Sequence, residues 1–326
     1  MKKELELWQF AAEKLKQNQT VMLLIVAENS GSSPGRQGFK MIVAEDGLAG
    51  SIGGGVMEVR LVELAKGSVK GKRKKEKGKN KTQIVEQVHR KNSENSSGMI
   101  CSGKQTVIFF EMNPQDLKTV REIIRALKNH QAKALQISDS RFQISENSPE
   151  FDYKFEQKDN GEFLYEEKLG FKNHLFIVGG GHCALALSEL VSKMDFYISL
   201  FDDRADLNTL EKNRFVQAKT IIESYEKIGE FIPSGANHYV VVMTLGYKFD
   251  EIVIRKLFDK NFKYFGVLGS RAKMKTLLKN LVKEGFPKEK LNQIHTPIGL
   301  PINSQTPEEI AVSIAAEIIA VKNAKG

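Results

Sequence analysis

A glycine turn followed by an acidic residue is the part of this sequence that most directly indicates a binding chemistry. Residues 179–184 read Gly-Gly-Gly-His-Cys-Ala, which fits G-x-G-x-x-A, and Asp202 follows at the end of a later apolar run. Glycines let the backbone approach a pyrophosphate, a helix N-terminus offers free N–H groups, and an acid about 20 positions on can accept from a ribose hydroxyl. The alternative is a turn whose glycines serve close packing only.

The elements around this turn occur in the order that a dinucleotide-binding unit needs. An apolar run at 175–178 predicts a buried parallel strand, and helical spacing follows over 185–191. A second strand is predicted at 197–201, directly before the acid. Strand, glycines, helix, strand and acid together predict a Rossmann-like, doubly wound parallel sheet.

Two later apolar runs extend this predicted sheet. The run at 239–243 ends at Thr244, and the run at 264–268 ends at Gly269-Ser270-Arg271. In a doubly wound sheet such strand ends lie at the ligand edge. Arg271 can hold a phosphate bidentately there, or it can be a solvated helix residue.

The first half of the chain carries two further candidates. Gly53, Gly54 and Gly55 precede a helical pattern, so they form either an anion cradle of free N–H groups or a tight corner that needs positive φ angles. Cys101 precedes a β-branched strand at 106–110. Its position can expose a thiol to a ligand, or Cys101 can be a small buried apolar residue.

The bulk composition excludes several classes of protein. The net charge is +9, but residues 66–81 hold eight Lys and one Arg against one Glu, which leaves +1 for the rest of the chain. A basic run without interleaved aromatic residues favours a solvated loop over a nucleic-acid surface. Two cysteines give no disulfide framework, the N-terminus does not read as a signal peptide, and no apolar run reaches membrane-spanning length. We therefore expect a soluble cytoplasmic protein without a membrane partner.

The chain divides into two domains of ordinary size. Residues 1–170 alternate predicted helices and strands, with a hairpin turn at 45–47. Their last part, about 141–170, is polar with isolated aromatic residues and reads as a hairpin or linker. The predicted boundary lies close to Gly170, with the Rossmann-like domain at 171–326. The expected fold class is thus α/β, with a distinct α/β domain before a doubly wound sheet.

Six separated motifs resemble one family, the xanthine dehydrogenase accessory factors (XdhC/CoxI), which handle molybdenum cofactor for molybdenum hydroxylases. The longest of the six, residues 295–318, is the most specific. In chain order the motifs are Gly31-Ser32-Ser33-Pro34; Gly50 to Gly55 with Glu58; Cys101-Ser102-Gly103; Gly179 to Ala184 with Asp202-Asp203-Arg204; Gly269-Ser270-Arg271; and His295 to Ile318.

The resemblance implies a protein that binds, protects, matures or inserts molybdenum cofactor, with NAD(P) or another nucleotide as a further possible ligand. It implies a molybdenum hydroxylase and a cysteine desulfurase as partners, and a homodimer is expected. It assigns Cys101 to sulfur or molybdenum handling, because a thiolate is a soft metal ligand. The remaining residues that it assigns to cofactor binding are Gly53, Gly54, Gly55, Glu58, Ser102, Gly103, Gly179, Gly181, His182, Asp202, Asp203, Arg204, Thr244, Gly269, Ser270 and Arg271.

The sequence departs from the family pattern at three places. Val56 stands where many members have a cysteine, Leu245 where many have a histidine, and Ser102 interrupts the cysteine motif, so Cys101 is the remaining thiol candidate. The alternative function is an NAD(P)-dependent oxidoreductase, which needs a proton-relaying group near the nicotinamide. The candidates His182, His238 and His295 show no recognisable pairing. A pure interaction module or nucleotide sensor is the third hypothesis.

Overall fold

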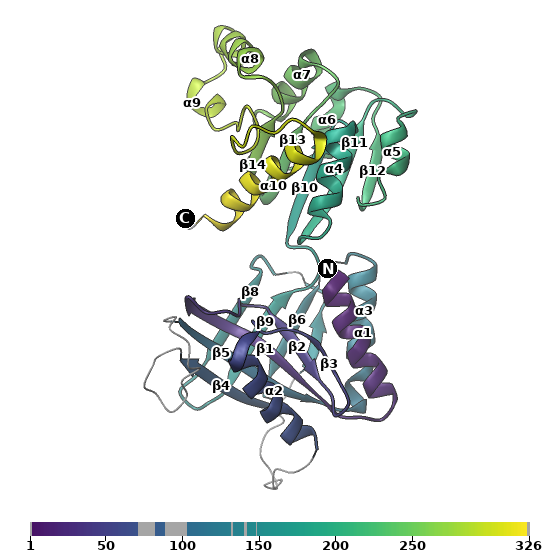
Figure 1. The fold of residues 1–326 in the computed structure, drawn as a ribbon, viewed down its shortest axis with the longest axis vertical. Coiled ribbons are helices and arrows are strands. Elements are labelled where there is room, and N and C mark those ends of the chain that lie inside the picture. The colour runs from purple at the N-terminus through teal and green to yellow at the C-terminus, as the bar shows by residue number, and fades with distance from the viewer. Residues whose placement is uncertain are drawn as a thin grey trace. The chain divides into compact units, whose positions relative to one another are not determined.

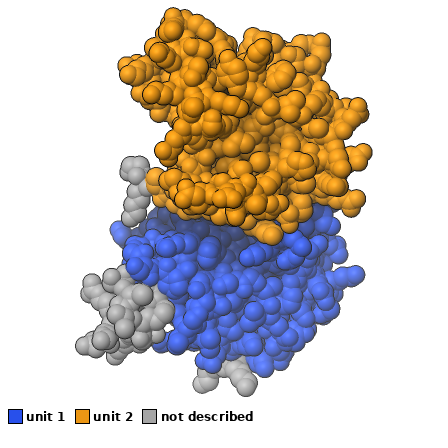
Figure 2. Space-filling view, turned by 45° about the horizontal axis from the view of Figure 1, so that its top comes forward, with its two compact units in different colours: residues 1–170 blue, residues 171–326 orange. Residues whose placement is uncertain are grey.

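The computed structural model describes residues 2–70, 82–88, 103–131, 133–139, 142–147 and 149–324. The chain divides into two compact units, Met1–Gly170 and Phe171–Gly326, coloured separately in Figure 2. The mixed α/β class predicted from the sequence is confirmed. None of the described helices is long and apolar enough to cross a membrane.

The first unit contains two antiparallel sheets (Figure 1). The larger sheet has the order β3-β2-β1-β5-β4, and the smaller has β7-β6-β9-β8. The strands are β1 Val21–Gly31, β2 Lys40–Val43, β3 Leu48–Gly50, β4 Thr82–Val88, β5 Gly103–Met112, β6 Ala134–Ser138, β7 Phe142–Ser145, β8 Tyr153–Gln157 and β9 Phe163–Lys168; the helices are α1 Lys2–Lys16, α2 Gly55–Val69, the 3₁₀ turn η1 Pro114–Asp116 and α3 Leu117–Lys128.

Strand β1 is apolar without interruption over its first half because both faces of its sheet are covered. Leu23 and Ile25 belong to the core that α1, α3 and the smaller sheet complete. Leu24 and Val26 belong to a second core, which α2 completes. The side chains of a strand alternate between its faces, so a strand buried on both sides must be apolar at every position.

The segment at 141–170 is not a free linker. It forms β7, β8 and β9, and β8 and β9 pair as a hairpin, one of the two alternatives that the sequence left open. A buried ion pair ties it to the larger sheet: Lys40 Nζ lies 2.7 Å from Glu167 Oε1, and the Tyr165 hydroxyl donates to Glu167 Oε2 at 2.9 Å. The polar residues that suggested a linker therefore include a buried charge with its own partners.

The second unit is a parallel five-stranded sheet of order β12-β11-β10-β13-β14. This confirms the doubly wound prediction. Its strands are β10 Asn173–Val178, β11 Phe196–Asp202, β12 Ala218–Ile221, β13 Gly235–Val242 and β14 Phe262–Val267; its helices are α4 His182–Val191, α5 Asn208–Lys212, the 3₁₀ turn η2 Tyr225–Lys227, α6 Ile228–Phe231, α7 Tyr247–Leu257, α8 Arg271–Lys283, α9 Lys288–Leu291 and α10 Pro307–Asn323.

Helices cover both faces of this sheet. Leu175 and Ile177 of β10 pack with α4 and α10, whereas Phe176 and Val178 pack with α6, α7 and α8. The strand therefore needs apolar residues at successive positions, which the sequence supplies.

The family-specific motif near the C-terminus builds the edge of the sheet. His295 forms an isolated parallel bridge with Gly266 of β14, and the N–H of Ile298 donates to the Val267 carbonyl at 3.1 Å. Thr306 and Glu309 then form a capping box at the start of α10. The motif thus has a structural role.

His174, at the start of β10, is held in its neutral form. Burial, and secondarily the neighbouring His238, lower the pKa of His174 to about 4, and its Nε2 lies 2.9 Å from Ser199 Oγ. The folded state disfavours the proton that the unfolded chain binds near pH 6.5. The contribution of neutral His174 to the free energy of unfolding is therefore fully present above about pH 6.5 and is lost as the pH falls toward 4.

We predict that His174→Gln reduces the loss of stability that the second unit suffers as the pH falls. Between neutral pH and pH 4, the wild type should lose about 2–3 kcal/mol more free energy of unfolding than the variant does. Circular dichroism during urea unfolding checks it, while the fluorescence of Trp8, the single tryptophan, reports the first unit. An equal effect from the exposed His182→Gln would contradict the prediction.

Candidate functional site

The carboxyl edge of the parallel sheet brings together most of the predicted site residues of the second unit. β10 pairs with β11 on one side and with β13 on the other, so the connections leave in opposite directions at this point. Helices α4, α7 and α8 begin directly after β10, β13 and β14, respectively. Doubly wound sheets bind ligands at such a switch point, and helix N-termini attract anions there.

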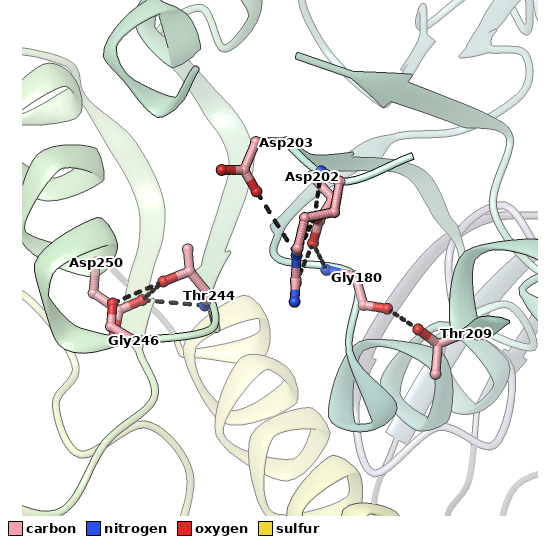
Figure 3. A network of polar contacts seen from close by, with 8 residues as sticks. Gly180, Asp202, Asp203, Thr209, Thr244, Gly246 and Asp250 are labelled. Carbon is pink, nitrogen blue, oxygen red and sulfur yellow. Dashed lines mark hydrogen bonds and ion pairs between the residues drawn. The ribbon is translucent and has the colours of Figure 1, made fainter. Parts of the chain in front are cut away.

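The glycine turn after β10 is shaped by close backbone contacts. Gly179 has a φ of 106°, and a Cβ atom on it would lie 2.3 Å from the carbonyl oxygen of Met243. Gly180 donates its N–H to Asp202 Oδ2 at 2.6 Å and accepts from the Thr209 hydroxyl at 2.5 Å (Figure 3). Gly181 is the N-cap residue of α4 and provides no side-chain cap. The turn therefore requires glycine for both conformation and space.

Asp202 is fully buried, and its carboxylate is saturated by donors from the chain. Oδ2 accepts from Gly180 N–H and from Arg204 Nη2, whereas Oδ1 accepts from the N–H and the Nε of Arg204 at 2.9 Å each. Burial alone would raise the pKa of Asp202, but the Arg204 guanidinium and these N–H groups outweigh it and lower the pKa. Asp202 thus holds the turn against β11.

Asp203 and Tyr225 lie beside this group. The Asp203 side chain is 26% exposed, and its Oδ1 is 3.8 Å from Arg204 Nε. Tyr225 was missed from the sequence; its ring is buried, and its hydroxyl makes no hydrogen bond within the described part of the chain. Burial and the two carboxylates raise the pKa of Tyr225, so the phenol keeps its proton. A tyrosine in a polar loop after a strand was its only sequence signal.

The polar groups of Thr244, after β13, are used within the chain. Its N–H and hydroxyl both donate to Asp250 Oδ1, at 3.1 and 2.7 Å. Burial raises the pKa of Asp250, against the effect of the bonds from Thr244. Leu245, where many family members have a histidine, is 73% exposed. This loop therefore presents an apolar side chain, rather than an imidazole, at the edge.

The remaining predicted residues of this edge lie at helix starts. His182 is the first residue of α4 and is exposed. After Gly269, Ser270 is the N-cap of α8 and accepts from the Lys273 N–H at 3.4 Å, and Arg271 is exposed at the first helical position. Arg271 is placed where it can reach an anion at the carboxyl edge.

In the first unit, the glycines at 53–55 form the corner before α2 with φ angles of 128°, 75° and 72°. Glu58 Oε2 accepts from the N–H groups of Ile52 and Gly54 and from the Ser51 hydroxyl, at 2.8, 2.9 and 2.6 Å. Burial alone would raise the pKa of Glu58, but these bonds prevail and lower it. The structure thus shows a positive-φ corner whose N–H groups hold an internal carboxylate.

Three motifs of the first unit meet through their glycines. A Cβ atom on Gly53 would lie 2.4 Å from the Gly35 nitrogen, and one on Gly103 would lie 2.6 Å from the Ser33 nitrogen. Buried Gln105 joins them, because its Oε1 accepts from the Ser33 hydroxyl at 2.8 Å and from the Gly35 N–H at 3.3 Å. Residues far apart in sequence therefore form one compact junction.

Several predicted features lie outside the described residues. Cys101, Ser102 and most of the basic loop at 66–81 are among them. Within the described ranges, no cluster of three or more His, Cys, Asp or Glu side chains is arranged to hold a metal ion. Cys183, in α4, is half-buried, and burial and Glu308 raise the pKa of its thiol, which makes it a poor nucleophile near neutral pH.

A five-stranded parallel sheet with a glycine turn at its switch point defines a Rossmann-type binding domain, here preceded by an antiparallel domain. The XdhC Rossmann domain family matches residues 175–318, and the XdhC and CoxI family matches residues 14–77. The chain belongs to the XdhC/CoxI family.

Known proteins agree with this assignment. The chain is 31% identical over 169 residues to a protein of Bacillus subtilis (strain 168) described as a probable subunit of xanthine dehydrogenase, covering 51% of this chain and 47% of that protein. It is 29% identical over 156 residues to "Uncharacterized protein YqeB" of Escherichia coli (strain K12), covering 47% and 28%. The chain thus matches less than half the length of each of these curated relatives.

A solved structure supports the fold. A crystal structure described as a xanthine dehydrogenase from Bacillus halodurans aligns with a TM-score of 0.69, covering 98% of this chain and 96% of that one. The sequence identity is 20%, so this likeness concerns the fold.

We predict that Gly53→Ala destabilises the first unit more than Gly54→Ala does. Both residues have positive φ, which costs an alanine about 1 kcal/mol. Only the Cβ at position 53 meets backbone, whereas nothing lies within 4 Å at position 54, so Gly53→Ala should cost roughly 2 kcal/mol or more. Urea unfolding followed by Trp8 fluorescence measures both, and equal losses would contradict the proposed junction.

Proposed function

We propose that this protein is an accessory factor of a xanthine dehydrogenase-type molybdenum hydroxylase, which binds molybdenum cofactor and helps to mature or insert it. The observation that carries this proposal is the carboxyl edge of the family's Rossmann domain, where a glycine turn leads into the uncapped start of α4 and none of the described histidines is held as an acid–base group. Such a site suits the holding of a ligand for another protein better than its chemical conversion.

The histidines support this reading over an NAD(P)-dependent oxidoreductase. His174 and His238 lie toward the amino ends of β10 and β13, away from the glycine turn. His295 contacts Glu317, with Nδ1 3.2 Å from Oε1. His182 lies at the edge, but it has no described hydrogen-bond partner that would orient it as a base. Proton relay requires a positioned group, and none of the described histidines is positioned for it at this edge.

The residues have distinct roles under this proposal. The start of α4 receives a phosphate portion of the cargo, because the N–H groups of its first turn have no side-chain cap. Asp202 positions the turn, and Arg271 offers a cation at the same edge. The junction of Gly35, Gly53 and Gly103 supports the start of β5.

We predict that the protein purified from molybdate-supplied cells carries molybdenum and an oxidisable pterin, or acquires both when mixed with free cofactor. Elemental analysis and the fluorescence of the oxidised pterin measure the cargo. A cofactor-free hydroxylase should gain activity faster with the loaded protein than with free cofactor alone. Absence of both cargo and activation, with the protein folded, would contradict the proposal.

Cys101 remains a proposed group for sulfur or molybdenum handling, with a cysteine desulfurase as the proposed source of sulfur. We predict that Cys101→Ala lowers the activation of the hydroxylase by about tenfold or more, because a thiolate is the soft ligand or sulfur carrier. Cys183→Ala, which removes the other cysteine of the chain, is the matched control and should keep activation. Full activation by Cys101→Ala would remove Cys101 from the mechanism.

A further inference from the structure

We infer that the carboxyl edge of the parallel sheet takes a pyrophosphate-linked dinucleotide with an unphosphorylated ribose, and that Asp203, rather than Asp202, accepts the ribose hydroxyls. The inference rests on the proposed function, since it names the ligand class of the same edge. It also changes the role that the sequence gives to the acidic residue after the second strand.

Asp202 has no capacity left for a ribose. A carboxylate offers about four acceptor positions, and Gly180 and Arg204 fill them with four donors. Its side chain is also fully buried. A ribose hydroxyl would have to displace the guanidinium or the N–H that shapes the turn, so Asp202 is a positioning residue.

Asp203 retains the exposure and the acceptor capacity that Asp202 lacks. Its side chain is 26% exposed, and its described contact is the longer one, 3.8 Å, to Arg204 Nε. Hydroxyl groups are good donors to such a carboxylate. Two carboxylates with one guanidinium leave this group a net charge of −1, which repels a phosphate on the ribose. The local charge therefore selects a neutral diol.

Tyr225 independently indicates a ligand at this position. Its side chain is 2% exposed, and its hydroxyl finds no acceptor among the described residues. The carboxylates of Asp202 and Asp203 are near enough to influence the phenol. A buried donor without an acceptor is costly, and a ligand oxygen beside Asp203 would satisfy it.

The same edge offers an apolar surface for a base. The Tyr225 ring lies 5.7 Å from that of Phe249, which is 38% exposed, and Leu245 of the preceding loop is 73% exposed. A flat base can cover these side chains. With a phosphate at the start of α4, the edge thus provides separate places for a base, a ribose and a pyrophosphate.

The test uses the full chain with NADH, NADPH, and the mononucleotide and dinucleotide forms of the pterin cofactor, titrated by calorimetry. Wild type should bind a dinucleotide, and NADH at least about tenfold more tightly than NADPH if the nicotinamide dinucleotide is the source. Asp203→Asn should weaken the bound dinucleotide about ten- to hundredfold, as loss of a charged hydrogen-bond acceptor does. Asp206→Asn, at an exposed residue nearby with the same change of charge, should not.

Three outcomes would overturn the inference: no dinucleotide bound, preference for the phosphorylated ribose, or unchanged affinity in Asp203→Asn with its circular dichroism intact. The two proposals fail separately. Binding that depends on Asp203 without activation of a hydroxylase would reject the accessory function and keep the site. If the protein activates a hydroxylase with the mononucleotide cofactor, and Asp203→Asn activates it equally well, the dinucleotide site would be rejected and the accessory function kept.

Discussion

The carboxyl edge of the parallel sheet depends on one buried carboxylate, that of Asp202. A buried charge is tolerated only when it is paired and hydrogen-bonded, and here the guanidinium of Arg204 and the N–H of Gly180 meet that condition. The same bonds join the end of β11 to the turn between β10 and α4. Because the Thr209 hydroxyl holds the other side of Gly180, the turn cannot shift without breaking a buried bond. The start of α4 therefore lies at this edge in a preorganised position.

The first unit uses the same device at a different corner. Glu58 accepts hydrogen bonds from the N–H groups of Ile52 and Gly54, as Asp202 accepts one from the N–H of Gly180. In both places a glycine-rich corner that reads as an anion cradle already contains an anion from the chain itself. An incoming phosphate must use the neighbouring N–H groups at the helix start, and the internal carboxylate sets where those groups point. The two predictions left open from the sequence, a cradle or a tight corner, are thus compatible at each site.

Family specificity and ligand contact are separate properties in this chain. The most distinctive motif, 295–318, pairs with the edge strand β14 and forms the capped start of α10, so it maintains the fold. The groups to which we assign a ligand are Asp203 and Leu245, in loops after strands, and Tyr225, at the start of the 3₁₀ turn η2. Loops at the carboxyl edge are free to vary in chemistry because the strands and helices behind them carry the packing.

The sequence by itself determined the doubly wound sheet, since continuous apolar strands, a glycine turn and a capping box are local patterns with a period or a fixed spacing. It also determined the hairpin turn at 45–47. Only the tertiary structure decided that 141–170 is part of a sheet, because the partner of Glu167 is Lys40, distant in sequence. It likewise decided the roles of Asp202 and Asp203. Two adjacent aspartates are chemically identical in sequence, and what separates them is which one is buried and already saturated with hydrogen bonds.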